Sequence, residues 1–323
     1  MPTVLITGGH TGLGLECAKQ LVSRSRLNLV LAGRNLERVE PAARQLRALG
    51  VKVSVLQLDT SSLASVRAAA GQCRAMLASG QIDTLQAIIC NAGAQFNGPI
   101  SYSVDGYEET FATNYLGHFL LVDLLIDTVA DHGRIVFTAS GTHDPATMDG
   151  KMVGVAAEAN AIALANDGKQ GAKPLSGGKR YTTSKLCMIL YSYELDRRLK
   201  SAGSSIASIA YDPGLVPETG LTRTMPKPVQ WLSRTSLMKS ILKRMGVTAG
   251  SLGFSGAALA RVAADAEFVN GSGKFFQSND GRLIEQRSSV ASYDKASAAR
   301  LWQDTETLTH LLPEERPALF GAS

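Results

Sequence analysis

The feature that most constrains the fold is a short apolar run that leads directly into a glycine-rich turn. The run Thr3–Ile6 is followed by Thr7-Gly8-Gly9-His10-Thr11-Gly12-Leu13-Gly14, where a helical pattern begins. Glycines at these positions permit a tight turn, close approach of the backbone to a diphosphate, and close packing of helix on strand. The free N–H groups at the start of the helix would bind that diphosphate. This arrangement predicts the first strand and helix of a dinucleotide-binding unit.

The chain then repeats this alternation of short apolar runs and longer stretches of helical periodicity. Further apolar runs are Leu27–Leu31, Val51–Leu56, Leu85–Cys90, Arg134–Thr138, Ser205–Tyr211 and Gly273–Gln277. Helical stretches are Leu13–Ser23, Leu36–Leu49, Leu63–Ser79 and Gly106–Ala130. This pattern predicts an α/β fold, a single Rossmann-type doubly wound domain over residues 1–323. We expect a central parallel sheet of about seven strands with helices on both faces.

Two segments interrupt the alternation and are interpreted as lid-like insertions in the domain. Residues 141–179 are rich in Gly, Ala, Asn and Asp and have little apolar periodicity. Residues 222–246 contain six basic residues, no acidic residue, and large apolar residues such as Trp231 and Met238. The second segment fits either a substrate lid with a solvated basic face or a helix on a membrane surface that collects lipophilic substrate.

Composition excludes several classes of function. A net charge of +5 is too small to favour nucleic-acid binding, and no apolar run approaches the ~18 residues of a membrane span. No His, Cys or carboxylate cluster has metal-ligand spacing, so no metal is expected. The cysteines are scattered and no secretory leader is recognisable. We therefore expect reduced thiols in a cytoplasmic protein, with peripheral membrane contact left open.

The end of the second apolar run indicates which dinucleotide is bound. NAD-binding folds usually place an acidic residue there to hold the ribose 2′-hydroxyl, but this chain has Gly33 followed by Arg34. A guanidinium is suited to a 2′-phosphate through charge-assisted hydrogen bonds. The pair predicts NADP(H) as the cofactor. His10 in the turn is either an additional donor or a bystander.

Several later motifs occur in a fixed order along the chain: Leu58-Asp59-Thr60, Asn91-Ala92-Gly93, Thr113-Asn114-Tyr115, Tyr181-Thr182-Thr183-Ser184-Lys185 and Asp212-Pro213-Gly214. Together with the glycine turn, they make the chain resemble the short-chain dehydrogenases/reductases over nearly its whole length. The resemblance implies that Asp59 holds the adenine, that Asn91, Ala92 and Gly93 line the ribose, and that Asn114 steadies a helix and a proton-relay water. The cofactor-binding residues predicted from the motifs and the resemblance together are Gly8, His10, Thr11, Gly12, Leu13, Gly14, Arg34, Asp59, Thr60, Asn91, Ala92, Gly93, Tyr181, Lys185, Pro213, Val216 and Thr219.

The catalytic candidates also make chemical sense by themselves. Hydride arriving at a carbonyl leaves an alkoxide that must be protonated, and a tyrosine can do this if a cation acidifies its phenol from a pKa of about 10. Tyr181 and Lys185 are four residues apart, so they share a helix face. Ser140 ends a strand at the edge where such sheets bind ligands, and its hydroxyl can polarise the carbonyl. Thr138 and Thr142 lie nearby, and it is the resemblance that selects Ser140. Asn114 completes the catalytic set.

Finer details resemble the branch that contains retinol dehydrogenases and light-dependent protochlorophyllide reductases. They include Asn114–Phe119, Ser184–Cys187, Leu301-Trp302 and, for the second group in particular, Pro213–Leu221. The short loop after Gly93 departs from those photoenzymes. We therefore expect a carbonyl reductase that works in the dark on a bulky, apolar small molecule. One alternative is a light-dependent protochlorophyllide reductase that reduces a C=C bond, and a second is a non-catalytic regulatory or binding module. Substrate identity and oligomeric state are left open.

Overall fold

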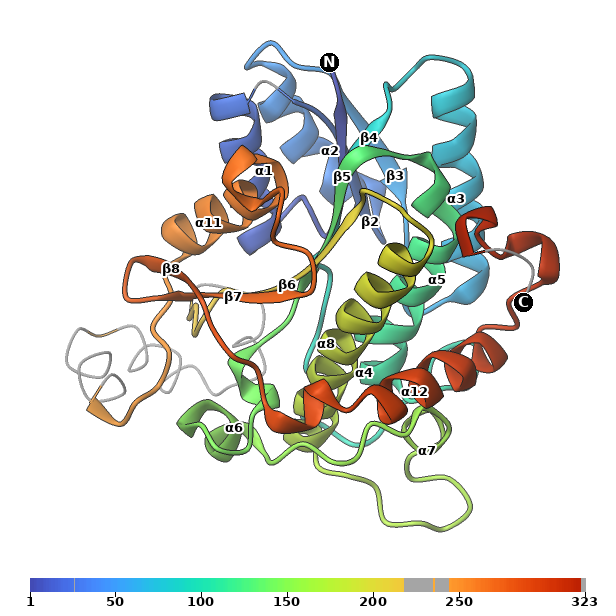
Figure 1. Ribbon diagram of the computed structural model, residues 1–323, viewed down its shortest axis with the longest axis vertical. Coiled ribbons are helices and arrows are strands. Elements are labelled where there is room, and N and C mark those ends of the chain that lie inside the picture. Colours follow the sequence, from blue (N-terminus) through green and yellow to red (C-terminus); the bar gives the residue numbers. More distant parts are fainter. Residues whose placement is uncertain (26, 218–234, 236–243, 321–323) are drawn as a thin grey trace.

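The computed structural model describes residues 1–25, 27–217, 235 and 244–320. Its eight-stranded sheet has the order β3-β2-β1-β4-β5-β6-β7-β8 (Figure 1). Strands β1 to β7 pair in parallel, and β8 pairs with β7 antiparallel. The direction of the strand order reverses between β1 and β4, which is the place where open α/β sheets bind ligands. The strands are β1 (Thr3–Thr7), β2 (Asn28–Gly33), β3 (Val53–Gln57), β4 (Leu85–Cys90), β5 (Val129–Thr138), β6 (Ala207–Asp212), β7 (Lys274–Asn279) and β8 (Arg282–Glu285).

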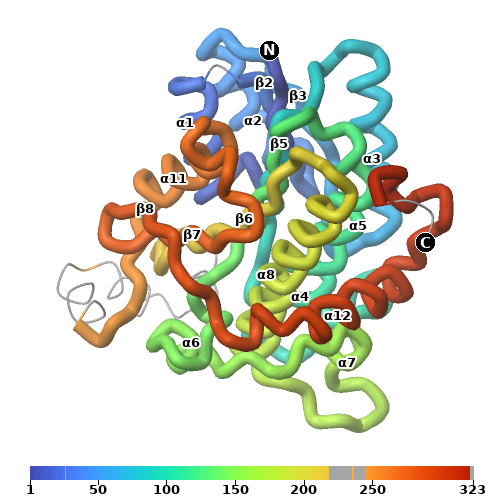
Figure 2. The backbone as a smooth tube through the Cα atoms, in the orientation of Figure 1, coloured from blue at the N-terminus to red at the C-terminus, as the bar shows by residue number. Residues whose placement is uncertain are grey.

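Helices cover both faces of this sheet, which confirms the predicted fold class. One face carries α1 (Gly12–Ser25), α2 (Leu36–Arg47) and α11 (Leu252–Ala264), packed on alternate strand residues such as Val4 and Ile6. The other face carries α3 (Leu63–Ala78), α5 (Gly117–Leu125) and α8 (Gly177–Ser201), packed on residues such as Leu5. The C-terminal helix α12 (Lys295–Leu308) lies beside α8, as Figure 2 shows in red.

Local sequence explains where these elements begin. Every residue of β1 and β2 is buried, as expected for central parallel strands that are covered on both faces. Asn35, Ser62 and Ser176 precede α2, α3 and α8, and each side chain accepts a hydrogen bond from a backbone N–H in the first turn. Such N-caps satisfy donors that have no partner within the helix. The caps therefore fix the points at which the chain leaves each loop at the sheet edge.

Two features differ from the sequence expectation. The stretch predicted as one helix over Gly106–Ala130 comprises α4 (Glu109–Phe111), a π-helical segment (Ala112–Leu116), α5 and a 3-10 turn, and β5 already begins at Val129. Strand β8 was missed, and it makes the sheet eight-stranded with one antiparallel edge. The Asp280-Gly281 turn before β8 has φ of +51° and +73°, and an Asp-Gly pair is a recognised hairpin signal.

The first predicted insertion, 141–179, contains more regular structure than expected. It includes a 3-10 turn (Gly141–His143), α6 (Met148–Val153) and α7 (Ala161–Ala165), and α8 begins inside it at Gly177. The second insertion, 222–246, lies mostly outside the described residues, as do Trp231 and Met238 within it. Thr235 and the three residues 244–246 are its described members.

Candidate functional site

The glycine turn between β1 and α1 has the geometry that the sequence led us to expect. Gly8 and Gly12 have φ of +66° and +52°, in the left-handed region that favours glycine. A Cβ added to Gly14 would lie 2.5 Å from the Gly8 carbonyl oxygen and 2.6 Å from Asn91 Nδ2. The start of α1, with Thr11 and Leu13, therefore packs directly against the turn. Its free N–H groups are placed at the carboxyl edge of the sheet, where they fit a diphosphate.

Thr7 joins this turn to the loop after β4 and to α5. Its Oγ1 accepts hydrogen bonds from Asn91 N and Ala92 N, both at 2.9 Å. The same hydroxyl lies 2.9 Å from His118 Nε2. His118 Nδ1 lies 3.0 Å from the Asn114 carbonyl oxygen, so Nδ1 carries the proton and Nε2 accepts from Thr7. Burial lowers the pKa of His118 to about 4, which keeps the imidazole neutral.

Asn114 lies in the π-helical segment and connects two parts of the site. Its Oδ1 accepts from Ala94 N at 2.8 Å, and its Nδ2 donates to Ala94 O at 3.0 Å and to Ser184 Oγ at 2.9 Å. The amide thus holds the loop after Asn91-Ala92-Gly93 against α8. The proton-relay role implied by the family resemblance stays a prediction.

Tyr181, Lys185 and Ser140 come together where α8 crosses the end of β5. Tyr181 and Lys185 are each 4% exposed, and Lys185 Nζ lies 5.6 Å from the Tyr181 ring centroid. Lys185 Nζ donates to Thr138 O at 2.8 Å. A Cβ on Gly93 would lie 3.6 Å from the same Nζ, so the predicted ribose-lining loop is adjacent. These residues, far apart in sequence, therefore form one constellation at the carboxyl edge.

The titration of this constellation is dominated by burial. Burial raises the pKa of Tyr181, a side-chain hydrogen bond with Ser140 opposes the increase, and the charge of Asp212 adds to it. Burial lowers the pKa of Lys185 to about 8, and Asp212 opposes that decrease. The raised pKa of Tyr181 runs opposite to the acidified phenol expected from the sequence. The reason is that the ammonium is directed to Thr138 O, while the phenol is fully desolvated.

The predicted adenosine side of the site contains His10, Gly33 and two arginines. A Cβ on Gly33 would lie 2.8 Å from His10 Cε1, so the imidazole packs on the glycine that ends β2. His10 Nδ1 is buried and has no hydrogen-bond partner among the described residues. Arg34 is exposed, and the charge of Arg38 on α2 contributes to a lowered pKa of His10, after burial. Arg38 was missed by the sequence analysis. An unpartnered donor or acceptor beside two cations fits an anionic group better than a ribose hydroxyl alone.

Asp59 and Thr60 follow β3 at the same edge. Asp59 Oδ1 accepts from Ser61 N at 3.0 Å and from Ser61 Oγ at 2.7 Å. Thr60 is buried, and a Cβ on Gly117 would lie 2.0 Å from its carbonyl oxygen. The strand end is therefore held against the first turn of α5.

The predicted nicotinamide side begins after β6. Pro213 O accepts from Ser255 Oγ at 2.6 Å, and Val216 is buried. Leu215 N donates to Thr248 O at 2.9 Å, and Gly250 N donates to Leu215 O at 3.0 Å. These bonds fix the loop beside the returning segment. Thr219, the third residue predicted here, lies outside the described residues.

His143, at the start of the first insertion, also proves to hold the site in place. Its Nδ1 lies 2.7 Å from Ser140 O, and its Nε2 accepts from Ser289 N at 2.9 Å. One partner is a carbonyl oxygen and the other is an N–H group. The neutral imidazole, with one N–H and one unprotonated nitrogen, therefore satisfies both. His143 therefore fixes the backbone of Ser140 against the C-terminal region.

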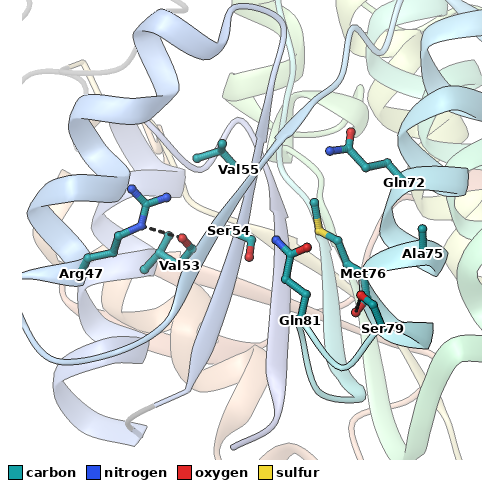
Figure 3. A pocket seen from close by; sticks show the side chains of 9 residues that line it. All are labelled: Arg47, Val53, Ser54, Val55, Gln72, Ala75, Met76, Ser79 and Gln81. Atoms are coloured by element: carbon teal, nitrogen blue, oxygen red, sulfur yellow. Dashed lines mark hydrogen bonds between the residues drawn. The ribbon is translucent and has the colours of Figure 1, made fainter.

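A cavity of about 500 Å³ lies elsewhere, beside the amino-terminal half of the edge strand β3 (Figure 3). Arg47, Ser54, Gln72 and Gln81 contribute to its lining. None of its lining residues belongs to the constellation at the carboxyl edge. All four cysteines are buried and unpaired. Over the described ranges, no group of three or more His, Cys, Asp or Glu residues is arranged to hold a metal ion, and no helix is long and apolar enough to cross a membrane.

Comparison with known proteins identifies the family and similar folds. A model of the short chain dehydrogenase family matches residues 2–150. The polyprenol dehydrogenase of Danio rerio is 31% identical over 315 residues, covering 95% of this chain and 86% of that protein. Protochlorophyllide reductase A of Oryza sativa subsp. japonica is 30% identical over 327 residues, covering 96% and 81%. A solved structure of an uncharacterized protein from Mycobacterium Paratuberculosis aligns with a TM-score of 0.67 and 27% identity, covering 96% of this chain and 94% of that chain.

Proposed function

Since this chain belongs to the short-chain dehydrogenase family, we propose that it is an NADP(H)-dependent oxidoreductase acting on a carbonyl or alcohol of a bulky, apolar substrate. The observation that carries the proposal is the meeting of Tyr181, Lys185 and Ser140 beside the glycine turn. The similarity to protochlorophyllide reductases and retinol dehydrogenases agrees with the branch predicted from the motifs.

In this proposal, each residue has one task. NADP(H), when bound, supplies or accepts the hydride. The hydroxyl of Ser140 donates a hydrogen bond to the substrate oxygen, and the hydroxyl proton of Tyr181 passes to that oxygen during reduction. Lys185 holds the nicotinamide ribose, which requires its ammonium to turn from Thr138 O toward the loop at Gly93. In oxidation the same proton returns to Tyr181.

The preference for NADP(H) rests on the group around His10. Arg34 would pair with the 2′-phosphate, Arg38 would add a second cation, and the unpartnered Nδ1 of His10 would gain a hydrogen bond. Gly33 leaves room there because it carries no side chain, and His10 occupies that space. No carboxylate occupies the position where NAD-binding folds hold the ribose hydroxyls.

We further propose that the insertion 141–179, together with the residues around Gly246, covers the substrate; the rest of 222–246 lies outside the described residues. Asp149 on α6 accepts a hydrogen bond from Thr248 Oγ1 at 2.7 Å, so the first insertion is bonded to the segment that follows the second. A Cβ on Gly246 would lie 3.9 Å from Met148, which brings the described end of the second insertion to α6. Exposed Met152, Leu215 and Met245 belong to these same segments or adjoin them, and they suit an apolar substrate.

The basic, acid-free composition of 222–246 supports a peripheral contact with an anionic membrane as the source of that substrate. The names of the similar proteins mention polyprenol, retinol and protochlorophyllide, which are all large and mainly apolar molecules. The substrate in this proposal is lipophilic, although none of the described helices is long and apolar enough to cross a membrane.

The second candidate is a light-dependent protochlorophyllide reductase, favoured by 30% identity over 96% of the chain. One experiment separates the candidates: NADPH loss is followed at a single wavelength with a panel of bulky apolar aldehydes and ketones and with protochlorophyllide, in darkness and in red light. Turnover of a carbonyl in darkness supports our proposal. Turnover of protochlorophyllide that requires light supports the second candidate, and no turnover of any compound favours a non-catalytic module.

A further inference from the structure

One buried carboxylate beside the site has no task in the proposed chemistry. Asp212 ends β6 and is 2% exposed. Its Oδ1 accepts from Gly214 N at 2.9 Å, and its Oδ2 accepts from Gln277 Nε2 at 2.8 Å. Both donors are uncharged, and no ion pair in the described part of the chain includes this carboxylate. A buried charge without an opposite charge bonded to it is costly, so its position calls for a reason.

The register of the sheet places Asp212 against the catalytic end of β5. Thr138 pairs with Tyr211, and Ala139 N donates to Tyr211 O at 2.7 Å. A Cβ added to Gly141 would lie 2.9 Å from Asp212 Oδ2. Because Lys185 Nζ is bound to Thr138 O, the carboxylate, the ammonium and Ser140 all lie at the adjoining ends of two strands.

The first insertion brings a second carboxylate to the same place. The added Cβ on Gly141 would lie 3.5 Å from Asp149 Oδ2, so Asp149 and Asp212 approach Gly141 together. Burial raises the pKa of Asp212, hydrogen bonds from Gln277 and Gly214 oppose the increase, and the charge of Asp149 adds to it, giving a pKa of about 6. Asp212 is therefore ionised at neutral pH and becomes protonated in mild acid.

Asp212 acts on the two titrating residues of α8 in the same direction. Its negative charge raises the pKa of both Tyr181 and Lys185. A negative charge in a poorly solvated site favours the ammonium over the neutral amine and the phenol over the phenolate. Of the other titratable groups, Asp149 from α6 acts on Asp212 through its charge, and the charge of Asp212 also raises the pKa of its neighbour Tyr211 in β6.

We propose that Asp212 is a positioning residue for the reaction, which keeps Lys185 as the ammonium at neutral pH and so maintains a positive charge beside the proton donor Tyr181. Asp149 sets the pH at which Asp212 loses its charge. The inference rests on the proposed function, because it assigns the proton donor to Tyr181. It concerns protonation states of this chain alone, which can be measured without any substrate.

The test uses the full chain labelled with [ζ-13C]tyrosine and [ε-13C]lysine and titrated by NMR from pH 5 to 11. The signals are assigned by their loss in Tyr181→Phe and Lys185→Met. Asp212→Asn should lower the apparent pKa of Lys185 by about one pH unit, the lower end of the effect of a neighbouring charge, while Tyr181 stays a phenol over this pH range in both proteins. Asp149→Asn is the matched control, since it removes a half-buried carboxylate that also approaches Gly141. It should leave the pKa of Lys185 high and move the inflection caused by Asp212 to lower pH.

A further variant keeps the test decisive if Asp212→Asn does not fold. Gln277→Leu removes a hydrogen bond from Asp212 without removing its charge, so the inflection should move to higher pH, opposite to Asp149→Asn. An unchanged pKa of Lys185 in folded Asp212→Asn, or an inflection that none of the variants moves, would overturn the inference. The proposed function fails separately, if Tyr181→Phe retains normal turnover.

Discussion

Thr7 Oγ1 lies 2.9 Å from His118 Nε2, so a hydroxyl at the end of β1 is hydrogen-bonded to an imidazole in α5. The same hydroxyl accepts the backbone N–H groups of Asn91 and Ala92, and the other nitrogen of His118 is bonded to Asn114 O. Through one buried histidine, the glycine turn, the loop after β4 and the π-helical segment are held in register. The network requires a neutral imidazole, because the two lone pairs of the Thr7 hydroxyl already accept from Asn91 N and Ala92 N and leave none for a protonated Nε2.

The first prediction concerns stability in acid. The pKa of His118 is about 4 in the folded chain and about 6.5 when unfolded, so as pH falls the unfolded state takes up a proton first. The contribution of His118 is therefore complete above pH 6.5 and is lost as pH falls to 4, by about 3 kcal/mol. Urea unfolding across this range should show a steeper loss in the wild type than in His118→Asn. Coincident slopes would contradict the buried, neutral state of this residue.

A second prediction concerns the buried ion pair that precedes Tyr181. Arg180 and Glu108 are 4% and 2% exposed and lie 3.1 Å apart, Nε to Oε1. Arg180→Met leaves the carboxylate of Glu108 buried and unpaired, which should cost about 3–5 kcal/mol in the free energy of unfolding. The control is Arg197→Met on the same helix, whose partner Glu194 forms a partly exposed pair and should cost at most about 1 kcal/mol. Denaturant titrations measure the two losses in the free energy of unfolding. Equal losses would show that burial does not make the first pair more costly to break.

The third prediction is that the charge of Asp212 lowers the free energy of unfolding. The pKa of Asp212 is about 6 in the folded chain, above the ordinary value of 3.8, so its ionisation destabilises the fold increasingly as pH rises from 3.8 to 6. Asp212→Asn should therefore raise the melting temperature at pH 7.5, corresponding to about 3 kcal/mol, and have little effect at pH 4. A variant that melts lower than the wild type at both pH values would contradict this expectation.

The fourth prediction tests cofactor choice. Arg34→Ala should weaken NADPH binding by roughly 10- to 100-fold, the scale of one hydrogen bond to a charged group, and leave NADH binding unchanged. Arg44→Ala, which removes another exposed arginine from the α2 region, serves as the control and should affect neither cofactor. Fluorescence titration with both cofactors measures this directly. An equal loss for NADPH and NADH would place Arg34 away from the 2′-phosphate.

The parts of the molecule that local patterns control were predictable. Seven strands, the flanking helices and the glycine turn follow from apolar periodicity and from the conformations that Gly8 and Gly12 adopt. The Tyr181 and Lys185 pair was recognisable because four residues on a helix share one face. Strand β8 was within reach, since the Asp280-Gly281 pair is a hairpin signal that the analysis did not use.

The parts that depend on distant contacts were not predictable. Nothing local distinguishes the π-helical turn at Asn114 from ordinary helix, because the apolar pattern is compatible with both. Nothing local indicates the role of His118, because its partner Thr7 is 111 residues away. Asp149 belongs to an insertion without clear periodicity, and only the folded chain brings it to Gly141 beside Asp212. The predicted direction of the pKa shift of Tyr181 was wrong, because the sequence shows the neighbouring lysine but not how deeply the phenol is buried.

The most direct test of the central claim is the turnover of Tyr181→Phe with NADPH and the best carbonyl substrate of the panel, measured in darkness. The substitution removes the proton donor and little else. We therefore predict a loss of turnover of about 10²- to 10⁴-fold, with NADPH affinity nearly unchanged. Lys185→Ala, measured in parallel, should reduce both turnover and NADPH affinity, because in the proposed function the ammonium also holds the ribose. A Phe variant that keeps the wild-type rate in darkness would show that another group delivers the proton and would contradict the mechanism.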